Sequence, residues 1–122
     1  MKTVQLATYT LEEVFRFIDA DKVVFTAPSR SLRQVMAVYS GTKSEKEARE
    51  FIYEGIKCLT NKHFCGSQVQ WGDLVVDKYG LMFDGRPWFV KFAIVDGELE
   101  EISFHPPEKE LKTLSGLVIP KG

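Results

Sequence analysis

Cysteine is scarce in this sequence, and long apolar runs and a leader-like N-terminus are lacking. Its two cysteines fall on a helical pattern, at Cys58, and in a loop, at Cys65, which suits reduced thiols better than a disulfide scaffold. No apolar run approaches the roughly 20 residues that a membrane-spanning helix needs. The first residues also lack the long apolar core of a signal peptide. We therefore expect a cytoplasmic protein with no membrane contact.

An excess of charge of one sign is lacking as well. Lysines and arginines number 16 against 17 aspartates and glutamates, so the net charge is -1 and any basic patch must be local. Glycine-rich phosphate loops of the GxGxxG and GxxxxGK[ST] kinds are missing. The few cysteines and histidines have no zinc-ligand spacing. We expect neither a metal nor another cofactor.

The residues that are present describe an ordinary globular protein. Of the 122 residues, 44% are apolar and 27% are charged, which is enough for one domain with a real core over residues 1–122. The patterns place a helical part at about 9–60, a sheet at about 68–105 and a tail at 106–122.

Three stretches show the apolar spacing of amphipathic helices. A capping box of Thr10 and Glu13 opens a helix over 11–19, and a second helix is predicted over 29–40. Ser44 and Glu47 form another capping box, which opens a third helix that reaches residue 59. A short strand is expected at 22–26 and a polar connection at 60–70. The apolar face of the third helix should cover the core side of the sheet.

Residues 71–105 predict three consecutive antiparallel strands. The dipeptides Asp84-Gly85 and Asp96-Gly97 separate runs rich in β-branched and aromatic residues, which is a strong hairpin signal. A two-residue turn at the second dipeptide would put polar residues on the apolar face, whereas a three-residue turn with a glycine bulge would not. We therefore expect three-residue turns at both dipeptides. The core face then holds Leu74, Val76, Met82, Trp88, Val90, Phe92, Ile94, Ile102 and Phe104.

The fold class that follows is α+β, with the N-terminal helices packed on one face of a twisted antiparallel sheet from the C-terminal half. In this register Lys91 lies between Asp77 and Glu101, and His105 lies near Phe89. A bulge at Gly80 or Pro87 would shift the first strand by one residue. Residues 108–114 predict one helical turn, and 115–122 predict either an edge strand or a contact with a partner. The polar face holds Asp77, Tyr79, Phe89, Lys91, Glu101, Ser103 and His105.

The polar face holds the side chains that metal-free RNA cleavage needs: an acid, a base and a cation. At the end of the last strand His105 is placed either to transfer a proton with a ribose 2′-hydroxyl or leaving oxygen, or simply to cap the sheet. Lys91 is either an ordinary solvent-facing lysine or a phosphate clamp, and Glu101 either its ion-pair partner or a catalytic group. For His63 a solvated loop position is the simpler interpretation. The catalytic candidates are His105, Glu101, Lys91 and Tyr79, and the phosphate- or RNA-binding candidates are Arg86, Phe89, Lys62 and His63.

Three stretches resemble the motility quorum-sensing regulator toxins, which have a RelE/barnase-like ribonuclease fold. They are YTLEEVFRFIDADKVVFT, LTNKHFCGS and the strands from Trp71 to His105. The resemblance implies a metal-independent endoribonuclease that is neutralised by a protein antitoxin. The family's catalytic lysine, glutamine, tyrosine and lysine fall here on Gly66, Gly72, Phe89 and His105. Catalysis is therefore either rebuilt around the candidates above or absent from a retained fold.

Three functions from different classes follow from these residues. The first is a small cytosolic ribonuclease toxin that acts on RNA and pairs with an antitoxin. The second is a non-enzymatic protein-interaction module that uses the polar sheet face or the tail. The third is a nucleic-acid-binding protein without cleavage.

Overall fold

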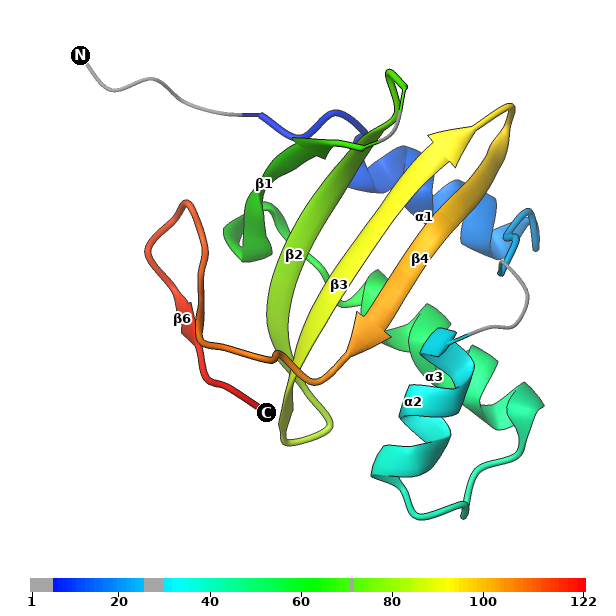
Figure 1. Ribbon diagram of the computed structural model, residues 1–122. Coiled ribbons are helices and arrows are strands. Elements are labelled where there is room, and N and C mark those ends of the chain that lie inside the picture. Colours follow the sequence, from blue (N-terminus) through cyan, green and yellow to red (C-terminus); the bar gives the residue numbers. More distant parts are fainter. Residues whose placement is uncertain (1–5, 26–29, 71) are drawn as a thin grey trace.

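The computed structural model describes residues 6–25, 30–70 and 72–122, with the side chain of Glu101 left out of the description. Within this part of the chain, three helices from the N-terminal half cover one face of an antiparallel sheet from the C-terminal half (Figure 1). The helices are α1 (Leu11–Asp19), α2 (Arg30–Val38) and α3 (Glu45–Lys57). The α+β architecture predicted from the sequence is confirmed.

Capping residues and apolar periodicity account for the helices. The hydroxyl of Thr10 accepts the N–H of Glu13 at the start of α1, and Ser44 and Glu47 form the full capping box of α3. Helix α3 lies close to the sheet at Gly55, where an added Cβ would be 2.6 Å from the ring of Phe104. The core is shared between the helices and the sheet, because buried residues of both, such as Ile52 and Phe104, belong to one cluster.

The main sheet has four strands in the order β1-β2-β3-β4, all antiparallel to their neighbours. They are β1 (Phe64–Val69), β2 (Val75–Phe83), β3 (Arg86–Val95) and β4 (Glu98–His105). The polar connection predicted at 60–70 is therefore wrong beyond the short 3-10 helix η1 (Asn61–His63). The sequence of β1 has only a weak strand pattern, and contacts with the rest of the fold decide its structure. Phe64 is buried beside Tyr79, and a bulge at Gly66 keeps the rest of β1 paired with β2.

Both Asp-Gly dipeptides form two-residue turns, not the three-residue turns predicted. Phe83 pairs with Arg86 across one turn, and Val95 pairs with Glu98 across the other. The aspartate and glycine have positive φ in both turns, 55° and 71° in the first and 50° and 77° in the second, as a type I′ turn requires. This geometry matches the twist of the strands, so the turn needs no additional residue.

The first turn reverses the predicted faces of β2. Asp77 and Tyr79 lie on the helix-facing side, opposite Phe92 and Val90, whereas Val76 and Met82 lie on the other side. The placement of Asp77 and Tyr79 on the polar face is therefore wrong. Asp77 is buried and has no ion-pair partner among the described residues. Its carboxylate is satisfied by hydrogen bonds instead: it accepts the N–H groups of Thr8 and Tyr9 and the hydroxyl of Ser67, at 2.6–3.1 Å.

The sequence pattern predicts one additional residue in the turn before β4, but the structure accommodates it in the middle of the strand. The pairing shifts by one residue between Lys91 and Ala93, which is a β-bulge. Helix α2 satisfies the backbone there: the hydroxyl of Ser31 donates to the carbonyl of Ile102 at 2.9 Å and accepts the N–H of Phe104 at 3.2 Å. Beyond the bulge Phe104 faces the core, as predicted.

The C-terminal segment forms a second, two-stranded sheet of β5 (Leu111–Lys112) and β6 (Val118–Ile119). The helical turn predicted at 108–114 is therefore wrong, and the tail pairs with its own chain. This hairpin packs on the sheet at Gly80, where an added Cβ would be 2.9 Å from Leu111 and 3.1 Å from Ile119. A side chain at position 80 would therefore clash with the hairpin.

The strand predicted at 22–26 is reduced in the structure to a single parallel bridge between Val23 and Leu99. Thr26, the last residue of that prediction, lies outside the described residues. Among the described residues, no helix combines the length and apolarity that crossing a membrane requires.

Candidate functional site

The candidate site lies on the face of the main sheet away from the helices, which we call the outer face. Lys78 of β2 lies opposite Lys91 of β3, and Lys91 lies opposite Ser103 of β4. Like charges placed directly opposite each other destabilise a sheet. Both lysines are half-buried, and no carboxylate described in the structure lies within 4.0 Å of either ammonium group. This lysine pair is therefore suited to an anion from outside the chain.

The next row of the outer face holds His105, where β4 ends. Its ring is 5.1 Å from that of Phe89 on β3 between centroids, so the predicted proximity of the two residues is confirmed. The Nδ1 atom lies 2.8 Å from the carbonyl oxygen of Pro106. A carbonyl only accepts hydrogen bonds, so we infer that Nδ1 carries a proton and donates it to this oxygen, which leaves Nε2 for chemistry.

A pocket of about 490 Å³ adjoins this histidine. One wall comes from the outer face, and the other comes from the segment that leads from β4 to β5. The pocket combines aromatic and aliphatic surface with one carboxylate and one ammonium group. It is lined by Phe89, His105, Pro107, Glu108, Lys109 and Leu111. Glu108 was missed in the sequence because its segment was expected to form a helical turn outside the sheet.

Tyr79 does not belong to this site. It is fully buried on the helix-facing side, with ring centroids 5.4 Å from Phe64 and 5.3 Å from Phe92. Burial, and secondly the charge of Asp77, raise the pKa of its hydroxyl far above the ordinary value. The hydroxyl has no hydrogen-bond partner among the described residues. It therefore has no route to a ligand on the outer face.

Arg86 is also separated from His105. It alternates with buried Trp88 and so lies on the helix-facing side, where its guanidinium is 5.3 Å from the ring centroid of Tyr39. The hydroxyl of Tyr39 donates to the carboxylate of Asp84. Burial and this carboxylate raise the pKa of Tyr39 to about 12. The arginine thus belongs to a cluster beside the end of α2, and the structure does not bring this phosphate-binding candidate to His105.

Lys62 and His63 lie in η1, just before β1, at the opposite edge of the sheet from β4. The ring of His63 accepts the N–H of Thr60 at 3.0 Å, and burial together with Lys62 lowers its pKa. The structure does not bring either residue to the pocket of His105. Glu101 belongs to β4, but its side chain is outside the described part, and Lys91 faces Ser103 instead of Glu101.

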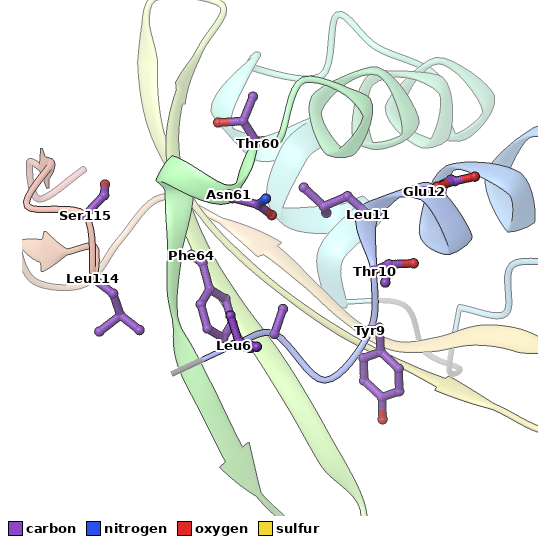
Figure 2. Close-up of a pocket in the computed structure, with 11 residues that line it drawn as sticks. Leu6, Tyr9, Thr10, Leu11, Glu12, Thr60, Asn61, Phe64, Leu114 and Ser115 are labelled. Carbon is purple, nitrogen blue, oxygen red and sulfur yellow. The ribbon is translucent and has the colours of Figure 1, made fainter. Parts of the chain in front are cut away.

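A larger groove, of about 760 Å³, lies between the N-terminal segment, η1 and the loop of the C-terminal hairpin (Figure 2). Leu6 of the N-terminal segment, Phe64 of β1 and Leu114 of the hairpin loop all line it. At its rim Leu6 is 78% exposed and Leu114 is 54% exposed. None of the predicted site residues lines it.

Other chemistries find little support in the described residues. No three or more histidine, cysteine, aspartate or glutamate side chains in this part of the chain gather closely enough to hold a metal ion. Both cysteines are free, and burial raises the pKa of the Cys65 thiol, which keeps it from being an activated nucleophile.

Comparisons of the chain with protein-family models, curated protein sequences and solved structures give no match. The resemblance to the motility quorum-sensing regulator toxins therefore stays a prediction from sequence. The outer face itself brings together one histidine, one aromatic ring and two lysines.

Proposed function

We propose that this protein is a metal-independent endoribonuclease whose site is the outer face. The observation that carries the proposal is that Lys78 and Lys91 are half-buried, have no carboxylate partner among the described residues, and lie one row from the Phe89–His105 contact. Adjacent residues on one face of a strand are about 7 Å apart. A nucleotide spans this separation, with its phosphate at the lysines and its base on the aromatic ring.

The reaction that fits these groups is transesterification within the RNA chain. The 2′-oxygen attacks phosphorus as its hydroxyl loses a proton, the bond from phosphorus to O5′ breaks, and O5′ gains a proton. The products are a 2′,3′-cyclic phosphate and a 5′-hydroxyl. His105 transfers one of the two protons through Nε2, and the lysines stabilise the charge that develops on the phosphoryl oxygens.

Cleavage of a mixed RNA substrate in EDTA tests this proposal. The wild-type protein should cleave, and His105→Ala should slow cleavage by about 10²–10⁴-fold, the usual contribution of a proton-transfer group. His63→Ala is the matched control, because His63 lies at the other edge of the sheet. Intact RNA with the wild-type protein, or equal cleavage by both histidine variants, would refute the proposal.

The toxin assignment rests on the sequence resemblance and has its own test. Expression of the wild-type chain should arrest bacterial growth, and His105→Ala should relieve the arrest. Co-expression of a small neighbouring reading frame, the expected place of an antitoxin gene, should also relieve it. Growth arrest that is unaffected by His105→Ala would argue against a ribonuclease toxin.

A protein-binding module is the second candidate, and the exposed groove favours it. Its apolar residues, among them Leu6 and Leu114, remain open to solvent in the described structure. In that case the product of the neighbouring reading frame should co-purify with the chain. Leu114→Asp should abolish the association, and His105→Ala should leave it intact. The opposite pattern would indicate that the partner binds at the outer face.

A further inference from the structure

We infer that Glu108 is the second proton-transfer group of the outer-face site. This inference rests on the proposed ribonuclease function and completes it, because cleavage needs one group that accepts a proton and another that donates one. Glu108 contributes the carboxylate of the pocket that His105 lines. Only two residues, both prolines, separate Glu108 from His105 in the chain, and both side chains line the same open pocket.

The segment that holds Glu108 is fixed on both sides. Before it, Pro107 is buried, and its carbonyl accepts the N–H of Gly122 at 2.9 Å. After it, Leu111 packs over Gly80 of β2. Two prolines and these contacts restrict the backbone, so the side chain of Glu108 projects from a defined position at the pocket.

The charges around the pocket favour Glu108 as the group that accepts a proton and His105 as the group that donates one. An ionised carboxylate only accepts hydrogen bonds, whereas a protonated imidazole donates from both nitrogens. Glu108 therefore takes the proton of the 2′-hydroxyl, and the Nε2–H of His105 protonates O5′ as it leaves. The Nδ1–H of His105 stays on the carbonyl of Pro106. The other charged groups facing this space are Lys109 at the rim and, one row away, Lys91 and Lys78.

The pH dependence of kcat/KM with a single-stranded RNA substrate in EDTA tests the inference. The wild-type profile should be bell-shaped, with an acidic limb from the base and an alkaline limb from the acid. Glu108→Gln should lower kcat by about 10²–10⁴-fold and remove the acidic limb. Glu108→Asp, which keeps a carboxylate, should retain that limb. Glu110→Gln is the matched control, since Glu110 is exposed nearby but does not line the pocket.

The outcomes separate this inference from the proposed function. A wild-type protein that cleaves RNA together with a Glu108→Gln variant that keeps kcat and the bell shape would overturn the inference alone. A variant that raises only KM would make Glu108 a substrate-binding residue and would also overturn it. A wild-type protein that leaves RNA intact would overturn both. Binding of 2′-O-methyl RNA, which has no nucleophilic hydroxyl, should be the same for wild type and Glu108→Gln.

Discussion

At the scale of single residues, burial separates the groups that can act from those that cannot. Tyr79 and His105 were both catalytic candidates, yet one is fully buried beneath the helices and the other borders an open pocket. A one-residue difference in turn length decides this, because it exchanges the two faces of a strand. The pattern of β2 could not reveal it, since buried Asp77 resembles a surface residue until its donors from Thr8 and Tyr9 are known.

The substitution Tyr79→Phe tests the buried position of this tyrosine. Its hydroxyl has no hydrogen-bond partner among the described residues, so removing it should raise the free energy of unfolding by about 1 kcal/mol. RNA cleavage should be unchanged. Urea denaturation and the cleavage assay measure the two effects, and a loss of cleavage without a loss of stability would return Tyr79 to the site.

The same residue predicts a dependence of stability on alkaline pH. Burial raises the pKa of Tyr79 in the folded state above its unfolded value of about 10. The folded state therefore binds more protons at high pH, so the contribution is complete below pH of about 10 and is lost as pH rises further. The variant Tyr79→Phe should lose less stability than wild type over that range. Equal losses would show that the hydroxyl is not buried.

At the scale of elements, local signals predicted the helices well and the sheet only in part. The caps at Thr10 and Ser44 are contained within a few residues: Ser44 forms the full capping box, and Thr10 accepts the N–H of Glu13. The β-bulge lies in the middle of β4, where Ser31 of α2, far away in the sequence, forms hydrogen bonds with the backbone of Ile102 and Phe104. Strand β1 and the β5–β6 hairpin likewise depend on long-range contacts, which a short apolar pattern does not record.

The bulge in β4 gives a prediction for Ser31→Ala. The change leaves the buried N–H of Phe104 and the carbonyl of Ile102 without their shared partner. The free energy of unfolding should fall by about 1–3 kcal/mol. Chemical denaturation measures this, with Ser40→Ala in the exposed turn after α2 as the control. A loss no greater than that of the control would mean that the bulge does not need the hydroxyl.

At the scale of the whole molecule, a net charge of -1 conceals an uneven distribution. Lys78 and Lys91 lie opposite each other without a described acid beside them, while Lys57 pairs with Asp19 on the helical side. The sequence predicted that any basic patch must be local, and it identified Lys91. It did not identify Lys78, because the predicted register turned that residue toward the core.

The most direct test of the account is the salt dependence of binding to single-stranded 2′-O-methyl RNA, measured by fluorescence anisotropy. If the lysine pair binds phosphate, Lys78→Met and Lys91→Met should each weaken binding and each lower the slope of log K against log salt by about 0.7. Lys46→Met, on the exposed side of α3, should leave both unchanged. Equal slopes for all three variants, or no binding by the wild-type protein, would contradict the assignment of the outer face as the RNA site.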